Sequence, residues 1–325
     1  MTICAARVWG LTFVFFLCSF CSIQPLWAGE DETKELDFSL NGHRVKVVYG
    51  DIVLAEYVQH DAVVSHPYWH TFRTLSGIQV TRNHPPVPSQ DRDDHSGLHT
   101  GAWLAFGDVS GHDFWRLKAK VVSKEYELIA GGAKSGVSMK TNSDWLTTDE
   151  SRVLMKERTS YEVTLVDGGY LLTWDSKFRA QESDVIFGDQ EEMGLGIRVA
   201  TSLAVDSNRG GRILDSEGRR NGSEVWGKVA AWCDYSGSID GRWVGVTVLV
   251  DSESGRPARS HARDYGFLAM NPFSTKAFTG GEATPFTLKM GETVALRYGL
   301  YIHEHVKEED FSVAPVEKLF VHQAK

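Results

Sequence analysis

The chain has 325 residues, of which 42% are hydrophobic and 24% are charged. These proportions are typical of a packed globular protein and exclude a collagen-like, coiled-coil or wholly disordered chain. The formal net charge of -9 disfavours nucleic acid as a partner, because an acidic surface repels phosphate backbones.

The first 28 residues are typical of a secretory signal peptide. Arg7 is the only charged residue before an uncharged apolar run over residues 8–21, and an acidic stretch begins at Glu30. The run is shorter than the about 20 apolar residues that span a membrane, which favours cleavage over an uncleaved signal anchor. We therefore expect a secreted or periplasmic protein with no membrane span after cleavage. Cys233, in an apolar run, is then its sole cysteine and is expected to be buried.

Strands joined by tight turns dominate the rest of the chain. The dipeptides Asn41-Gly42 and Asp167-Gly168 each lie between alternating runs and predict hairpins. Asp240-Gly241 ends the loop between two further runs, at residues 225–237 and 242–252. A long run over residues 292–305 is rich in aromatic and β-branched residues. Helical spacing is clear only near the C-terminus, around residues 315–320, with a weaker case at residues 152–158.

This pattern predicts a single all-β domain over residues 29–325, with few short helices. No low-complexity linker, repeat or charge block divides the chain. Many strands in one domain fold as a sandwich or a barrel, because a lone sheet leaves one face exposed.

The densest set of polar side chains lies in residues 82–115. His95 and His99 follow a run of aspartates that ends at Asp94, and an apolar strand follows them. The imidazoles suit general bases, metal ligands or hydrogen-bond donors to a sugar hydroxyl. Two histidines with nearby carboxylates are also sufficient for zinc or another divalent ion. The structural alternative is a loop held together by carboxylate–imidazole hydrogen bonds.

A second set contains the adjacent carboxylates Glu191 and Glu192, with Arg198 on the strand that follows. Adjacent strand residues point to opposite faces, so only one of the two glutamates is expected to face a cleft. The residues do not decide which one it is. Arg198 is placed to pair with a carboxylate. The alternative is a solvated acidic turn.

Two further strands alternate polar and aromatic residues. His261, Arg263 and Tyr265 share a predicted strand face that Asn271 closes. Farther along the chain, Arg297, Tyr301 and His303 are expected to project to one side. Such faces suit a sugar, since aromatic rings stack on its apolar face while polar groups bond its hydroxyls. Core packing is the alternative role for the aromatic residues.

Six sequence blocks together resemble a family. They are HPYWHTFRTLSGIQVTRNHPP, DDHSGLHTGAWLAFGDVSGHDFWRLKAKV, FGDQEEMGLGIRVATSL, VWGKVAAWCDYSG, HARDYGFLAMNPF and ALRYGLYIH. In this order they are similar to a bacterial secreted family of unknown function that is labelled methane oxygenase PmoA (PmoA-like). His95 and His99 match its histidine pattern, and Leu98 stands where the family has a third histidine.

The resemblance implies a fold similar to the large β-sandwich of galactose-mutarotase-like proteins, whose clefts bind sugars with histidine, arginine and carboxylate side chains. Similar proteins occur in bacteria that degrade polysaccharides, which suggests carbohydrate metabolism. The family label itself implies a metal-dependent oxidoreductase. Fold alone does not set function.

Three functions follow from these features. The first is a carbohydrate-active enzyme that uses acid–base chemistry on a glycan or small sugar ligand, of the hydrolase, lyase or epimerase type. The second is a glycan-binding module without catalysis, and the third is the metal-dependent oxidoreductase. No cofactor is expected in the first two, whereas a divalent metal at His95 and His99 belongs to the third. The expected catalytic residues are His95, His99, Glu191 and Glu192. The expected substrate-binding residues are Arg82, Asp94, Trp115, Arg198, His261, Tyr265, Asn271, Tyr301 and His303.

Overall fold

The computed structural model describes residues 34–130, 136–251 and 256–323. The expected signal peptide lies outside these residues, so the leader and the division into leader and single domain stay predictions. Within the described ranges, no helix is both long and apolar enough to cross a membrane.

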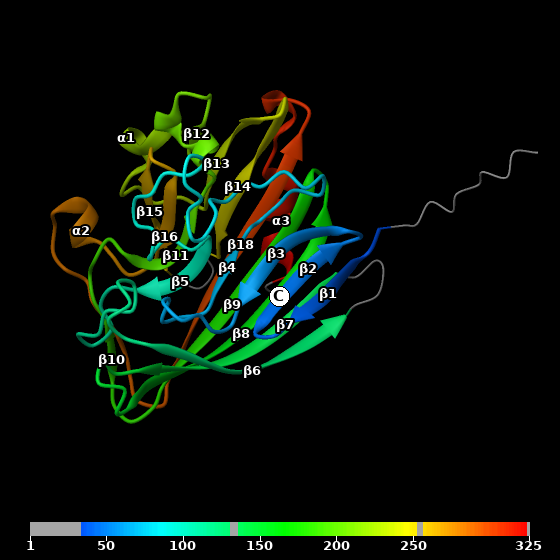
Figure 1. The fold of residues 1–325 in the computed structure, drawn as a ribbon. Helices are drawn as coiled ribbons and strands as arrows, with labels where there is room; N and C mark the ends of the chain where they lie inside the picture. The colour runs from blue at the N-terminus through cyan, green and yellow to red at the C-terminus, as the bar shows by residue number, and fades with distance from the viewer. Residues whose placement is uncertain (1–33, 131–135, 252–255, 324–325) are drawn as a thin grey trace, which may run out of the picture. The chain divides into compact units, whose positions relative to one another are not determined.

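The first of two eight-stranded antiparallel sheets runs in the order β1-β2-β3-β4-β5-β11-β16-β15 (Figure 1). Its strands are β1 (Leu36–Asn41), β2 (Arg44–Tyr49), β3 (Ile52–Val58), β4 (Tyr68–His70), β5 (Ala102–Phe106), β11 (Met193–Arg198), β15 (Arg259–Arg263) and β16 (Phe267–Asn271). The long connection from β4 to β5, residues 71–101, contains both candidate histidines.

The second sheet has the order β12-β13-β14-β18-β9-β8-β7-β6. Its strands are β6 (Val121–Ala130), β7 (Val137–Leu146), β8 (Val153–Val166), β9 (Gly169–Ala180), β12 (Arg212–Asp215), β13 (Trp232–Ile239), β14 (Arg242–Val250) and β18 (Thr293–His305). The short strands β10 (Val185–Phe187) and β17 (Phe286–Leu288) pair with each other.

The predicted hairpins form where the turn residues place them. Gly42 connects β1 to β2 with φ 61°, and Gly168 connects β8 to β9 with φ 73°. Between β13 and β14, Asp240 and Gly241 both have positive φ, at 51° and 75°. Positive φ at both central residues gives the turn a backbone twist that matches the right-handed twist of the strands.

The hydrophobic core lies between the two sheets. Trp69 of β4 packs edge-on against Tyr161 of β8, with ring centroids 5.3 Å apart. Phe106 of β5 contacts Trp145 of β7 at the same centroid distance. Alternate residues of both sheets thus enter one continuous core, to which the buried Cys233 also belongs. The large all-β sandwich predicted from the sequence is confirmed.

Helices are few and short. They are α1 (Asn221–Val225), α2 (Lys276–Thr279), α3 (Ala314–His322) and the 3-10 turns η1 (Thr201–Leu203), η2 (Val205–Ser207) and η4 (Glu308–Asp310). The C-terminal helix is confirmed, with Pro315 in its first turn and with Val316 and Phe320 buried. The weaker helix predicted over residues 152–158 is wrong. Those residues begin β8, whose alternating buried and exposed positions match a strand.

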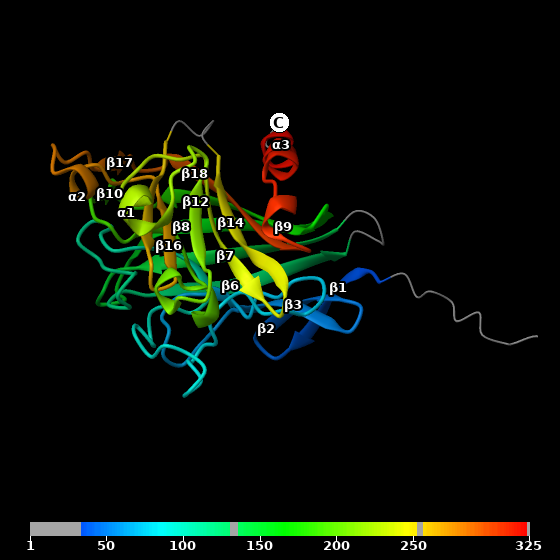
Figure 2. The same cartoon turned by 90° about the horizontal axis from the view of Figure 1, so that it is seen from above.

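The outer faces of the two sheets differ. On the second sheet, α3 packs over Leu171 and Tyr301, on the side away from β1, β2 and β3 (Figure 2). On the first sheet, Trp103, Trp115 and Phe267 form a smaller aromatic cluster. The rings of His95 and His99 stack on this smaller aromatic cluster of the first sheet, outside the main core.

Candidate functional site

A small pocket opens on the outer face of the first sheet. Its volume is about 120 Å³. It is lined by His95, Leu98, His99, Trp115, Arg116, Glu192, His261, Tyr265 and Phe267. The structure thus brings together six of the side chains that the sequence singled out, from four separate parts of the chain. We call this pocket the His95–His99 cleft.

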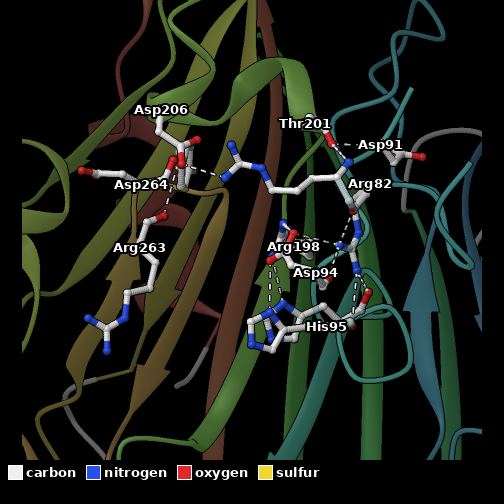
Figure 3. A network of polar contacts seen from close by, with 12 residues as sticks. Arg82, Asp91, Asp94, His95, Arg198, Thr201, Asp206, Arg263 and Asp264 are labelled. Carbon is white, nitrogen blue, oxygen red and sulfur yellow. Dashed lines mark hydrogen bonds and ion pairs between the residues drawn. The ribbon is translucent and has the colours of Figure 1, made fainter. Parts of the chain in front are cut away.

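Arg82 holds the loop that carries the histidines. Its buried guanidinium donates to the main-chain oxygens of Arg92 (2.9 Å), Asp94 (2.6 Å) and His99 (3.1 Å) (Figure 3). Burial lowers the pKa of Arg82 to about 10, and the neighbouring Arg198 adds to the effect. Because the side chain is buried and its terminal nitrogens are engaged, Arg82 shapes the loop and does not face a substrate.

Arg198 makes a two-point ion pair with Asp94. Its two terminal nitrogens donate to the two carboxylate oxygens at 2.8 and 2.7 Å (Figure 3). Its guanidinium also lies over the ring of Tyr265, 4.8 Å from the centroid. Burial opposes ionisation of Asp94, but the hydrogen bonds of Arg198 and His95 hold its pKa well below the usual value. Arg198 is 1% exposed and does not line the cleft, so it holds Asp94 and Tyr265 in place beneath the cleft surface.

His99 is a buried, neutral imidazole. Arg198 donates to its Nδ1 at 3.2 Å, which leaves the ring proton on Nε2. Its ring stacks on His95 on one side, at 4.6 Å, and on Phe267, at 4.8 Å. Burial, followed by the positive charge of Arg198, lowers its pKa well below the usual value. Within the described chain, Nε2 of His99 makes no hydrogen bond, so it is a free N–H donor.

In His95 the ring nitrogen Nδ1 is a hydrogen-bond donor, whereas in His99 it is an acceptor. Nδ1 of His95 lies 3.1 Å from a carboxylate oxygen of Asp94, which can only accept, so Nδ1 donates. The Nε2 atom is then left with its lone pair or a second proton. The residue has φ 51°, and 46% of its side chain is exposed. A carboxylate that orients an imidazole in this way prepares its far nitrogen to act as a base.

The structure decides between the two adjacent glutamates. Glu192 lines the cleft and pairs with Arg116 at 2.8 Å. Glu191 turns away from the cleft and accepts from Arg263 at 2.9 Å. Both glutamates lie in the bend before β11, so the strand alternation expected from the sequence does not apply to them. Glu192 is the member that lines the cleft.

His261 and Asn271 fasten the turn that carries these glutamates. His261 donates from Nδ1 to the main-chain oxygen of Glu191 (3.2 Å), and its Nε2 accepts from Arg263 (3.1 Å). Asn271 donates to the main-chain oxygens of Gln190 and Glu191, at 2.7 and 3.0 Å. Burial lowers the pKa of His261 to about 3, so the ring is neutral. Both residues are engaged with the protein, although an edge of His261 lines the cleft.

Tyr301 and His303 lie elsewhere. Both are on β18 of the second sheet, where Tyr301 donates to the main-chain oxygen of Asp167 at 2.9 Å. His303 is fully buried beside Asp234, with Nε2 3.0 Å from a carboxylate oxygen. The structure does not bring these two residues to the cleft.

The sequence did not single out Arg116, Leu98 or Phe267 as site residues. Arg116 directly follows Trp115 and sits within reach of both Asp113 and Glu192. The strand face predicted for His261, Arg263 and Tyr265 ends at Arg263, because Tyr265 lies in the turn over residues 264–266. Phe267 begins β16 after that turn, and no local pattern singled it out. Nothing local marks Arg116 as the partner of Glu192.

The donor set of the cleft does not suit a metal ion. In the described parts of the chain, no group of three or more His, Cys, Asp or Glu side chains is arranged to hold one. The Nδ1 atom of His99 faces the cation of Arg198, which would repel a second positive charge. The Nδ1 atom of His95 is engaged by Asp94.

One known family matches most of the chain. A family described as a family of unknown function (DUF6807) matches residues 44–314. The chain belongs to this family. The unknown-function part of the resemblance seen in the sequence is therefore confirmed, and the PmoA-like label stays a prediction. The comparison of this DUF6807 chain with curated proteins finds no match.

Several solved structures align with the DUF6807 chain at low identity. A proposed aldose 1-epimerase from Klebsiella pneumoniae aligns at a TM-score of 0.43 and 9% identity, over 89% of this chain and 88% of its own. A galactose mutarotase-like protein from Lactobacillus casei aligns at 0.36 and 10%, over 82% of this chain and 100% of its own. The Slr1438 protein from Synechocystis aligns at 0.31 and 11%, over 83% and 97%.

Proposed function

We propose that the protein is a secreted carbohydrate-active enzyme that moves protons on a sugar or sugar derivative held in the His95–His99 cleft. The observation that supports this proposal is the pair of stacked imidazoles with different open nitrogens. His95 offers Nε2 as a base, and His99 offers Nε2–H as a donor. Asp94 accepts the proton of Nδ1 in His95, and Arg198 donates to Nδ1 of His99.

The proton transfer runs from the substrate to His95. Nε2 takes a proton from a substrate hydroxyl, or from a carbon next to a carbonyl, and the carboxylate of Asp94 stabilises the imidazolium that forms. Negative charge develops on a substrate oxygen, which accepts the hydrogen bond from Nε2–H of His99. His95 then returns the proton to the product. Such general base catalysis contributes about 10²- to 10⁴-fold in rate.

The walls of the cleft suit a sugar ring. Tyr265, Phe267 and Trp115 offer aromatic surface, while Glu192 and Arg116 offer polar groups that can bond hydroxyls. Apolar walls with a few placed polar groups are typical of small-molecule sites. At about 120 Å³ the cleft is smaller than the roughly 300–1,000 Å³ of most ligand pockets. We therefore assign it a single sugar unit.

The same small volume favours a second candidate, a glycan-binding module without catalysis. Both candidates use the aromatic walls, but only the enzyme needs a base at His95 and an N–H donor at His99. A measurement of sugar binding alone does not distinguish the enzyme from the binding module. Turnover is therefore the deciding measurement.

The test is an NMR screen of the purified mature protein. A panel of aldoses, uronic acids and unsaturated sugar acids is followed for anomer exchange, epimerisation, elimination and deuterium uptake from D₂O. Turnover by the wild type that His95→Ala and His99→Ala each reduce at least 100-fold supports the enzyme. Turnover that survives both substitutions overturns it. Saturable binding without any turnover across the panel supports the binding module instead.

A further inference from the structure

Four exposed cations occupy neighbouring positions of two adjacent strands on the outer face of the second sheet. Lys156 on β8 is directly opposite Arg179 on β9, and Arg158 is directly opposite Lys177. All four side chains are exposed. Residues two apart on a strand point to the same face, so the two pairs are neighbours on one surface. We call Lys156, Arg158, Lys177 and Arg179 the basic quartet.

No side chain of the basic quartet makes a hydrogen bond or an ion pair with another described residue. The nearest candidates on β7 are engaged elsewhere. Asp144, opposite Lys156, pairs with Lys124 at 3.4 Å. Asn142, opposite Arg158, donates to Glu125 at 2.9 Å.

This arrangement costs stability in the free protein. Like charges directly opposite each other on antiparallel strands repel, and here two such pairs are consecutive. The chain as a whole has a net charge of -9, so a local excess of positive charge is not a general property of its surface. An anionic ligand over the quartet offsets the repulsion.

A groove runs beside the basic quartet. Its volume is about 630 Å³, and its lining includes Lys140, Arg158 and Lys177 together with the polar residues Asn142 and Ser160. The carboxylates of Glu125, Glu127 and Asp175 also line it. The groove therefore offers cations for an acidic group and both donors and acceptors for hydroxyls.

We propose that this face binds an acidic polysaccharide, with its carboxylates over the basic quartet and its hydroxyls on Asn142 and Ser160. The strand positions of the four residues lie about 5 Å apart across the strands and about 7 Å apart along them, which suits a ligand with separated charges. The denser charge of a nucleic acid is disfavoured by the carboxylates of the groove and by the net charge. The site is on the other sheet from the His95–His99 cleft and does not depend on its chemistry.

Binding of the full mature chain to polygalacturonate tests the proposal, with dextran as the neutral probe. We expect retardation of the wild type in a polygalacturonate affinity gel at 50 mM salt, loss of it at 500 mM salt, and no retardation by dextran. The double variant R158Q/K177Q is expected to bind about tenfold more weakly. The control K228Q/K307Q removes two exposed cations elsewhere and is expected to bind like the wild type.

Three results overturn the proposal. They are absence of polygalacturonate binding by the wild type, equal binding by R158Q/K177Q, and equal loss in the control variant. Duplex DNA and phosphatidylglycerol vesicles are run as competing probes. If either binds more tightly than polygalacturonate and loses affinity in R158Q/K177Q, the ligand class is wrong. Thermal unfolding verifies that the variant folds, since removal of like charges is not expected to lower its melting temperature.

Discussion

The rings of His95 and His99 stack 4.6 Å apart with only 6° between their planes, yet their Nδ1 atoms have opposite hydrogen-bonding roles. Asp94 accepts from Nδ1 of His95, whereas Arg198 donates to Nδ1 of His99. The ion pair between Asp94 and Arg198 joins the two partners. One acidic and one basic residue, in mutual contact, thus engage the Nδ1 atoms of two adjacent imidazoles in opposite ways.

His99 is expected to act through its N–H and not through proton release, because its pKa is held well below the usual value. In His99→Gln an amide N–H can take the place of Nε2–H, whereas His99→Ala has no donor there. We expect His99→Gln to keep kcat/KM within about tenfold of the wild type and His99→Ala to lose about 10²- to 10³-fold. Steady-state kinetics on a substrate found in the NMR screen provide the measurement. Equal losses in the two variants would show that the N–H is not used.

The two adjacent glutamates provide an internal comparison. Glu192→Gln removes the charge that faces the cleft, and we expect KM for the sugar to rise about tenfold. Glu191→Gln leaves the cleft lining unchanged but removes an acceptor of Arg263, so its effect is expected on stability, by about 0.5 kcal/mol. Substrate titrations and urea unfolding of both variants measure the two effects. The assignment of the cleft-facing carboxylate is reversed if Glu191→Gln alone raises KM.

The architecture could be predicted from local sequence because its signals are local. Alternation marks each strand, and Asn41-Gly42, Asp167-Gly168 and Asp240-Gly241 mark the turns. The helix expected over residues 152–158 was wrong because a local pattern can fit two structures. Its apolar residues also fit the alternation of a strand, and pairing with β7 and β9 decided the outcome.

The site was predictable only where its parts are close in sequence or share a strand. His95 and His99 lie in one loop, and His261 and Tyr265 lie near one turn. Tyr301 and His303 had the same residue chemistry, but the pairing of β18 with β9 and β14 places them on the other sheet. The pairing of β18 with β9 alone joins residues more than a hundred positions apart, which no local pattern specifies.

The burial of Arg82 and Arg198 was likewise not predictable from the sequence. Arg82 and Arg198 were expected to bind substrate, but both are 1% exposed and bind other groups of the protein. Only tertiary structure could provide the carbonyl and carboxylate partners that make burial of a guanidinium tolerable.

Arg82 is therefore expected to determine stability and not substrate contact. Arg82→Lys leaves at least two of the three main-chain oxygens without their donor, and we expect the free energy of unfolding to fall by about 3 kcal/mol. Arg92→Lys is the matched control, because Arg92 pairs with Asp206 at the surface, at 2.7 Å and with 37% of its side chain exposed. Its expected effect is below about 1 kcal/mol. Urea unfolding compares the two, and equal effects would show that Arg82 does not hold the loop.

Acidification is expected to destabilise the protein through its buried histidines. Burial lowers the pKa of His66 to about 4, and that of His84 also to about 4. In the unfolded chain these side chains titrate near 6.5, so between pH 6.5 and 4 the unfolded state binds more protons than the folded state. The free energy of unfolding therefore falls as the pH drops through this window.

For His66 alone, the expected loss between pH 7 and pH 5 is about 2 kcal/mol. His66→Asn removes the titrating ring and keeps a donor for the main-chain oxygen of Pro67, which His66 contacts at 3.1 Å. Urea unfolding at pH 7 and pH 5 is expected to show a smaller fall in His66→Asn than in the wild type, by about that amount. Between pH 7.5 and 9 the imidazole is neutral in both states, so the difference between the two proteins is expected to stay constant. An unchanged fall in His66→Asn between pH 7 and 5 would assign the acid sensitivity to other groups.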